Sequence, residues 1–75
     1  MTVITQNNTY EFIQNCDTRN IHVLYRGKDI FVESIEHLRI GERMTVYGYE
    51  INPEFGQFNN EGMFFTTSPI VDIIL

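Results

Sequence analysis

The stretch Leu38-Arg39-Ile40-Gly41-Glu42-Arg43-Met44-Thr45-Val46 contains the features that decide the fold. Its apolar residue Leu38 can fill the end of a core, and Gly41 gives the chain the freedom to turn a corner. Met44 and Val46 then alternate with polar residues, which is the pattern of a strand with one buried face. A strand that follows directly on a glycine corner is typical of a small, strongly bent antiparallel barrel.

Short segments on both sides of this stretch also predict strands. Residues 21–25 and 30–33 flank the compact turn Arg26-Gly27-Lys28-Asp29 and predict a β-hairpin. Residues 34–38 are compatible with one helical turn that has Ser34 as its N-cap, a length too short for an independent helix. The other segments predicted to be extended are residues 3–5, 10–14, 44–51, 63–68 and 70–75.

Residues 51–62 form the longest stretch without a regular pattern, and they include Pro53, Gly56 and Gly62. A loop of that length in so small a domain is either functional or a wide hairpin. Further along, Pro69 separates two predicted strands. A proline at such a position indicates an edge, a bulge or a corner.

The composition favours strands independently of any pattern. The chain has ten Ile, five Val and seven Thr but no Ala. Branching at Cβ restricts side chains in helices and suits a pleated surface, so an all-α fold is excluded. We predict a single all-β domain over residues 1–75, a five- or six-stranded antiparallel barrel of the SH3-like or OB-like kind.

The chain has few means of stabilising so small a domain. With 75 residues it buries only about 60% of the surface that its unfolded form exposes. Cys16 is the only cysteine, so neither an intrachain disulfide nor a cysteine-based zinc site is available. Residues 70–75 are apolar on both faces apart from Asp72, which predicts a homo-oligomer that covers one of those faces. The predicted interface residues of this strand are Ile70, Ile73 and Ile74.

The charge and hydropathy patterns argue against two classes of partner. The net charge is −5, and residues 44–75 contain four acids and no base, which disfavours direct binding to DNA or RNA. No apolar run approaches the roughly 20 residues of a membrane span, and the N-terminus lacks the basic flank of a signal peptide. The sequence therefore predicts a cytoplasmic protein with neither a membrane nor a nucleic acid as its partner.

No pattern in the chain predicts catalysis. Cys16 with His22 or His37 is a conceivable nucleophile–base pair, but Cys16 lies in a polar segment without any cysteine-enzyme signature. The two histidines have no third ligand at metal spacing, and neither Ser34 nor Ser68 lies in a nucleophile elbow. We therefore predict a protein that is not an enzyme and that uses no metal and no cofactor.

Basic residues at two predicted corners indicate a local anion site. Two lie in the hairpin turn and two at the next corner: Arg26, Lys28, Arg39 and Arg43. Arginine binds phosphate in bidentate fashion, and a neighbouring tyrosine can stack on a base. The alternative is that these residues pair with nearby acids and form an ordinary mixed surface. The tyrosines expected near the site are Tyr25, Tyr47 and Tyr49, and the competing acids are Glu33, Glu36 and Glu42.

A second candidate feature is Thr66-Thr67-Ser68-Pro69, in which three hydroxyls precede a residue with fixed φ. Hydroxyls and unpaired backbone donors at the end of a strand can bind a ligand. The same hydroxyls can instead satisfy the local turn. Thr67 and Ser68 complete the predicted ligand-binding set.

Three short motifs occur along the chain: Thr5-x-Asn7-x-x-Tyr10 near its start, Leu38-x-x-Gly41 in the middle, and Thr67-Ser68-Pro69-Ile70 near its end. Together they resemble an uncharacterised family of small bacterial and phage all-β proteins, which begin with a Thr-Asn-Ser-Tyr type segment and end with Thr-Ser-Pro-Val. The chain departs from that pattern at Asn8, where serine is usual, and at Ile70, where valine is usual. The end motifs can be neighbouring strands, with Asn7 turning the chain and Pro69 bending its partner.

The phage origin that this resemblance implies narrows the expected function to binding. We expect a phage-encoded counter-defence factor that sequesters a nucleotide-derived immune signal. The ligand would be a cyclic nucleotide or an ADP-ribose-type molecule, held in pockets at the subunit interfaces of a homo-oligomer.

Two alternatives remain open. The acidic last third of the chain, with the aromatic residues Phe55 and Phe58, fits an inhibitor that docks on a host defence protein or a nucleic-acid-binding protein. Loss of a salt-dependent complex on Phe58→Ala would favour that alternative. The other is a structural or accessory phage protein whose oligomer is its function.

Overall fold

Six strands build the fold. The computed structural model describes the backbone of residues 1–52 and 57–75, and the side chains of residues 1–50, 62 and 64–75. The strands are β1 (Thr2–Thr5), β2 (Thr9–Gln14), β3 (Ile21–Tyr25), β4 (Lys28–Glu36), β5 (Arg43–Asn52) and β6 (Gln57–Ile74). Within the described part of the chain there is no helix that could cross a membrane.

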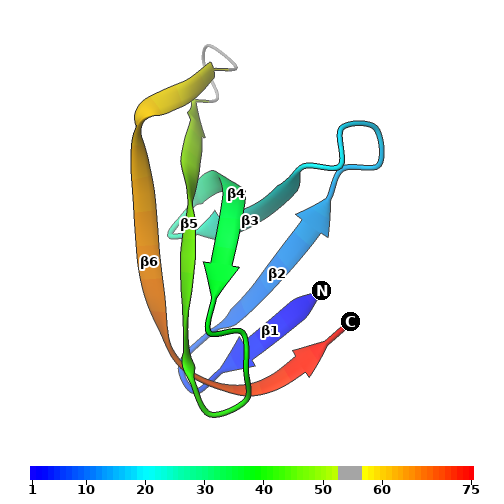
Figure 1. Cartoon of the computed structure of the whole chain (residues 1–75), viewed down its shortest axis with the longest axis vertical. Coiled ribbons are helices and arrows are strands. Elements are labelled where there is room, and N and C mark those ends of the chain that lie inside the picture. The colour runs from blue at the N-terminus through cyan, green and yellow to red at the C-terminus, as the bar shows by residue number, and fades with distance from the viewer. Residues whose placement is uncertain (53–56) are drawn as a thin grey trace.

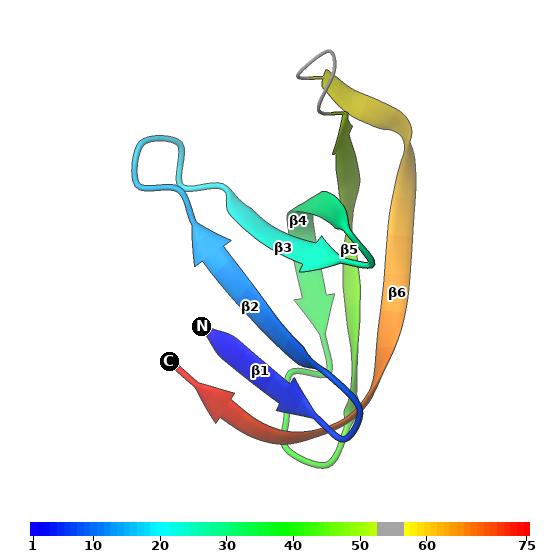
Figure 2. The same ribbon diagram turned by 180° about the vertical axis from the view of Figure 1, so that it is seen from behind.

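Each strand pairs with the next one along the chain, and β6 returns to β1, so that the sheet closes into a barrel. All of these strand pairs are antiparallel. Figure 1 shows β1 beside the end of β6, and Figure 2 shows the same closure from behind. The predicted all-β fold is confirmed, as is its small antiparallel barrel, which has six strands.

The β3–β4 hairpin forms where the sequence predicts it. Tyr25 pairs with Lys28 across the turn, so Arg26 and Gly27 alone make the loop. Both have positive φ, 51° and 77°, as the two-residue turns that match the twist of a hairpin require.

The predicted helical turn at residues 34–38 is wrong. β4 continues through Ser34 to Glu36, and its pairing with β5 resumes after a register shift between Val32 and Ser34. A single helical turn fixes several backbone dihedrals for one hydrogen bond. Pairing with the long neighbouring strand β5 therefore decides the conformation of this segment.

The predicted corner at Gly41 is confirmed. Gly41 has a φ of 88°, and its N–H donates a hydrogen bond of 2.7 Å to the carbonyl oxygen of Ile70 on β6. Leu38 packs against the core, while Met44 and Val46 lie inside it. The corner thus attaches the β4–β5 connection to the strand that closes the barrel.

A second glycine, Gly48, lies where β4 and β5 approach most closely. Its partner across the sheet is Val32. A Cβ atom at Gly48 would overlap with the backbone carbonyl of Phe31. Only a residue without a side chain fits at this point of the sheet.

The structure describes residues 51, 52 and 57–62 of the predicted irregular stretch, and they lie in paired strands. β5 extends to Asn52 and β6 begins at Gln57, with Ile51 paired to Phe58. Figure 1 shows the adjoining ends of β5 and β6 rising above the rest of the barrel. Antiparallel pairing of these ends agrees with the wide hairpin that the sequence predicts as one of two interpretations.

β6 is one strand of 18 residues, although the sequence predicts two strands separated at Pro69. Pro69 pairs with Arg43 of β5, and the next residue, Ile70, pairs with Thr5 of β1. Figures 1 and 2 show the strand curving below the barrel in this region. Proline donates no N–H, so it fits where a strand changes partners. The corner predicted at Pro69 is confirmed.

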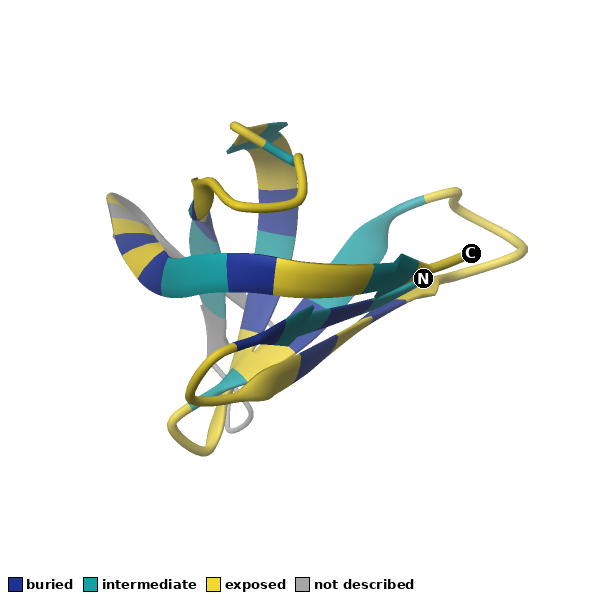
Figure 3. Ribbon diagram, turned by 90° about the horizontal axis from the view of Figure 1, so that it is seen from below, coloured by how far each residue is buried: buried dark blue, intermediate teal, exposed yellow. Residues whose placement is uncertain are grey.

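The core lies inside the barrel. Figure 3 shows buried positions alternating with exposed ones along the strands. Ten apolar side chains are buried among the residues whose side chains are described: Val3, Tyr10, Phe12, Val23, Ile30, Val32, Met44, Val46, Phe65 and Ile70. Ile70 is only 1% exposed, so it packs inside its own barrel and is not available to the oligomer interface at which the sequence-based prediction placed it.

Candidate functional site

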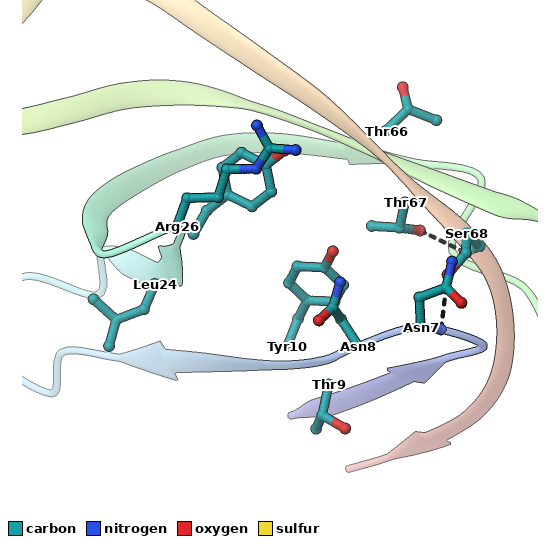
Figure 4. A pocket seen from close by; sticks show the side chains of 10 residues that line it. Asn7, Asn8, Thr9, Tyr10, Leu24, Arg26, Thr66, Thr67 and Ser68 are labelled. Carbon is teal, nitrogen blue, oxygen red and sulfur yellow. Dashed lines mark hydrogen bonds between the residues drawn. The ribbon is translucent and has the colours of Figure 1, made fainter.

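A pocket of about 410 Å³ opens in the barrel wall between β2, β3 and β6. β2 pairs with β3 only through residues 12–14 and 21–23, so the start of β2 and the end of β3 diverge. Figure 4 shows side chains from the β1–β2 turn, the β3–β4 turn and β6 around this space. The lining residues are Asn7, Asn8, Thr9, Tyr10, Leu24, Tyr25, Arg26, Thr66, Thr67 and Ser68.

Arg26 is the one residue with a full charge among the described residues of the lining. Its guanidinium carbon lies 5.3 Å from the centroid of the Tyr25 ring, a cation–π contact that orients the side chain. In the described part of the chain no carboxylate pairs with it. The left-handed backbone of Arg26 favours glycine or asparagine over arginine. An arginine at such a position, facing a pocket, is a candidate for a role beyond the turn.

Two tyrosines of the lining belong to an aromatic stack that is centred on Phe65 of the core. The Tyr25 and Phe65 rings are parallel within 3° with centroids 3.9 Å apart, and Tyr10 stacks on Phe65 at 5.7 Å. No hydrogen bond is formed by the hydroxyl of Tyr10 or Tyr25 within the described residues, and no buried side-chain polar atom among them lacks a partner. Both hydroxyls therefore keep contact with solvent, and they are available to a ligand.

Hydroxyl groups bind the β1–β2 turn to β6. The Ser68 hydroxyl donates to Thr5 Oγ1 over 2.9 Å and accepts the N–H of Asn7 over 3.1 Å. Thr5 Oγ1 in turn donates to the Asn8 carbonyl oxygen and accepts the Asn8 N–H. The Ser68 hydrogen is thus already used, so this residue positions the rim of the pocket and retains only acceptor capacity.

Thr67 is committed to the fold in the same way. Its hydroxyl donates to the Ser68 carbonyl oxygen over 2.8 Å and accepts the N–H of the buried Met44 over 3.2 Å. Thr67 and Ser68 therefore use their hydroxyls to satisfy groups of the fold, which is one of the two interpretations that the sequence allows for Thr66–Pro69. They shape one wall of the pocket without offering it a donor.

The side chains of Asn7 and Asn8 are the free amides of the site. Their backbones are fixed by Thr5 and Ser68, while neither side-chain amide has a hydrogen-bond partner among the described residues. Each amide carries donors and an acceptor. The pocket therefore combines one cation, two free amides and two phenolic hydroxyls, a set that suits a ligand with both anionic and neutral polar groups.

The predicted ligand-binding residues converge only in part. Arg26, Thr67 and Ser68 line the same pocket, whereas Lys28 contacts Glu50, with 3.8 Å between Nζ and Oε2. Arg39 and Arg43 lie beyond the other end of β4, a strand of nine residues that spans up to about 30 Å. The two basic corners therefore do not form one anion site, because the length of β4 separates them.

The two tyrosines predicted on β5 do not reach the pocket. Residues 44, 46 and 48 of β5 are buried, and Tyr47 and Tyr49 alternate with them on the outer face. The Tyr47 hydroxyl donates to Glu36 over 3.4 Å, and its ring lies 6.1 Å from that of Phe64. The tyrosines that line the pocket are Tyr25, which the sequence also predicts near the site, and Tyr10.

The residues predicted to form a protein interface fall into two groups. Phe55 and the side chain of Phe58 lie outside the described residues. On the last strand Ile73 is half-buried against the core and Ile74 is 51% exposed. The C-terminal strand therefore has one covered face and one exposed face, and the barrel itself covers the first.

Sequence reasoning missed Asn7, Asn8 and Tyr10 as site residues and assigned them to the turn and the strand. The signal was present in the two end motifs, which were predicted to be neighbouring strands. β1 does pair with β6, and Asn7 does contact Ser68. Motifs at opposite ends of a chain that meet in space are the ones that can share a pocket.

Two other features of the described residues are weaker candidates for a functional site. A groove of about 560 Å³ on the outer face of β2 and β3 includes the exposed Ile13 and Leu24 beside His22, whose Nδ1 lies 3.4 Å from an oxygen of Asp29. Cys16 is exposed. In the described part of the chain, no three residues among its His, Cys, Asp and Glu are grouped so that they could hold a metal ion.

Comparisons of the chain with protein-family models, with curated proteins and with solved structures find no match.

Proposed function

We propose that this protein is a non-enzymatic binding protein that sequesters a small nucleotide-derived anion in the pocket between β2, β3 and β6. One observation carries the proposal. Arg26 faces this pocket without an acid partner in the described residues, and it does so from a backbone position that favours other residues.

The groups of the pocket match the parts of a nucleotide. A guanidinium accommodates two phosphate oxygens at once. The amides of Asn7 and Asn8 and the hydroxyls of Tyr10 and Tyr25 supply donors and acceptors for a base edge or a ribose. The volume of about 410 Å³ lies in the range of small-molecule sites, about 300–1,000 Å³.

The lining favours binding over catalysis. Among the described residues, the lining includes no cysteine, histidine or carboxylate, the groups that most often act as nucleophile or general base. Thr67 and Ser68 use their hydroxyl hydrogens within the barrel. A ligand held here would therefore be released unchanged, as sequestration requires.

The biological setting of this proposal comes from the resemblance of the end motifs. A phage-encoded counter-defence factor in the cytoplasm of a bacterial host would bind a cyclic nucleotide or an ADP-ribose-type signal and lower its free concentration. The pocket described above is built within one chain, so such a protein needs no subunit interface to form it.

A matched pair of variants tests the site. Arg19 and Arg26 both have positive φ, 63° and 51°, and only Arg26 lines the pocket. Native mass spectrometry against a panel of cyclic oligonucleotides and ADP-ribose derivatives first identifies the ligand. Arg26→Asn should then weaken its binding at least tenfold, about 1.4 kcal/mol, and Arg19→Asn should leave it unchanged. Equal affinities of the two variants would place the ligand elsewhere, and a panel without a binder would refute the proposed ligand class.

A further inference from the structure

One edge of β6 has no partner over its middle part. β6 pairs with β5 along residues 57–69 and with β1 only from Ile70 onward. On the side away from β5, the described residues 64–67 have no neighbouring strand. Figures 1 and 2 show this part of β6 running along the outer side of the molecule. Alternate residues of an edge strand point their N–H and C=O groups away from the sheet.

Natural edge strands are protected by lysine, proline or a bulge that twists the edge away. Here the register of β6 against β5 shifts on both sides of residues 62–66, and Pro69 lies beyond the second shift. Between these shifts, residues 62–66 pair regularly with β5 and contain no charged residue. The edge is therefore a ready template for another strand.

An exposed aromatic pair adjoins the edge. Phe64 is 70% exposed, and it pairs across the sheet with Tyr47, with 6.1 Å between the ring centroids. A large apolar side chain exposed beside an open strand edge is the combination that strand addition buries.

We propose that a second copy of this chain covers the edge, and that the two β6 strands pair antiparallel about a two-fold axis next to Phe64. This pairing would continue the sheet from one barrel to the other and would place Phe64 beside Phe64 of the partner subunit. The inference rests on the pairing of β6 and not on the proposed ligand, although two of the residues it uses, Thr66 and Thr67, also line the pocket. It also replaces residues 70–75, the strand from which the sequence predicts self-association, as the surface of contact.

Three observations favour a second copy over a foreign strand. An uncharged strand meets no like-charge repulsion when it pairs with itself, whereas the chain as a whole has a net charge of −5. Two-fold antiparallel pairing satisfies both free edges in one contact. Finally, a barrel of 75 residues without a disulfide is of the size that gains most from association.

Charge reversal at Phe64 tests the two-fold arrangement. Sedimentation velocity of the whole chain should show a dimer that dissociates at least tenfold more readily in Phe64→Lys and in Phe64→Glu. Mixing the two variants should restore the dimer, because a two-fold axis next to residue 64 brings lysine and glutamate together. Restoration also demonstrates that both variants are folded. A wild-type chain that stays monomeric at its highest soluble concentration would refute the inference.

Two control variants separate this surface from others. Ile13→Lys changes a residue of similar exposure, 61%, on the outer face of β2, and Ile74→Lys changes the C-terminal strand. Both should leave the dimer intact, and a dimer lost only in Ile74→Lys would overturn the proposed surface. Amide hydrogen exchange gives a second readout: amides of residues 64–67 that point away from β5 should exchange more slowly as the protein concentration rises. Exchange that is independent of concentration would contradict strand pairing.

Discussion

Arg26 is the residue at which local conformation and the candidate site conflict most clearly. Its φ of 51° lies in a region that costs most residues about 1–2 kcal/mol and that asparagine and glycine tolerate. An Asn-Gly pair, which is common in two-residue hairpin turns, would adopt this backbone with less strain. The proposed ligand site gives this residue a role that the turn alone does not.

The first prediction follows from this conflict. Arg26→Asn should raise the free energy of unfolding by up to about 1 kcal/mol, because asparagine accepts the left-handed backbone. Urea denaturation measures this change. Arg19→Asn should behave alike in stability, since Arg19 has a φ of 63°. A destabilised Arg26→Asn variant would mean that the cation–π contact with Tyr25 contributes more stability than the backbone strain at residue 26 costs.

The second prediction concerns Gly48 of β5, which lies against the backbone of β4 at Phe31. Gly48→Ala should lower the free energy of unfolding by about 3 kcal/mol or more, because its Cβ would overlap with the Phe31 carbonyl group. Gly62→Ala is the matched control: its Cβ would meet nothing closer than a Tyr49 ring carbon at 3.6 Å. Thermal unfolding of both variants compares them. Equal melting temperatures would show that β4 can shift to make room.

The third prediction concerns the buried hydroxyl of Thr67. Thr67→Val keeps the shape of the side chain and removes the acceptor of the Met44 N–H. Leaving that buried donor unpaired should cost about 1–3 kcal/mol of stability. Thr66 is exposed and bonds only to Thr45, so Thr66→Val should change stability by less than about 0.5 kcal/mol. Chemical denaturation separates the two, and similar losses would contradict the assigned role of Thr67.

At the scale of the element, β6 combines three environments in one strand. It forms an arm of the wide hairpin with β5, then one wall of the pocket, and after Pro69 the strand that closes the barrel on β1. The environment at each position does not follow from the residue type alone. Ile70 and Ile74 show this most clearly, because they are the same residue on the same strand with exposures of 1% and 51%.

The fourth prediction uses this pair. Ile70→Ala should cost about 2–5 kcal/mol, the range for removing a fully buried Ile side chain, because it leaves a cavity in the core. Ile74→Ala should cost less than about 1 kcal/mol, since half of its surface already contacts water. Urea titrations at low protein concentration make the comparison within the single barrel. A large loss at Ile74 would indicate that its exposed face is covered in solution.

At the scale of the whole molecule, the barrel depends on contact between its two ends. β1 pairs with β2 on one side and with residues 70–74 of β6 on the other. The N-terminal ammonium group also donates to the Phe12 carbonyl oxygen over 3.2 Å. Closure therefore requires residues that are separated by almost the full length of the chain, so the barrel forms as one cooperative unit.

The fifth prediction tests this closure. Removal of residues 71–75 deletes mostly exposed side chains, yet it should unfold the barrel, because β1 loses its partner along Thr2, Val3 and Ile4. Removal of Leu75 alone, which is fully exposed and follows the last paired residue, should leave the melting temperature unchanged. Circular dichroism of the two truncated chains tests the contrast. A folded chain that ends at Ile70 would show that β1 is held by β2 alone.

Local patterns in the amino-acid sequence are enough to predict the class of fold and most of its strands. Branched and aromatic residues exclude helices as the main element, alternation locates the strands, and Gly41 and Pro69 mark the corners. These signals are local, because each is a preference of a residue or of its immediate neighbours. The error at residues 34–38 has the same origin: a local helical preference is visible in the sequence, and the β5 strand that overrides it is not.

Which residues share a site becomes visible only in the three-dimensional fold. Arg26, Asn7 and Tyr10 lie in different strands and turns, and nothing in their spacing shows that they line one pocket, nor that Arg39 and Arg43 lie at the opposite end of β4. It also decided that Ile70 faces the core while Ile74 faces solvent. The register and bend of β6 set these outcomes, and they result from the closure of the barrel, a long-range packing event that no local pattern encodes.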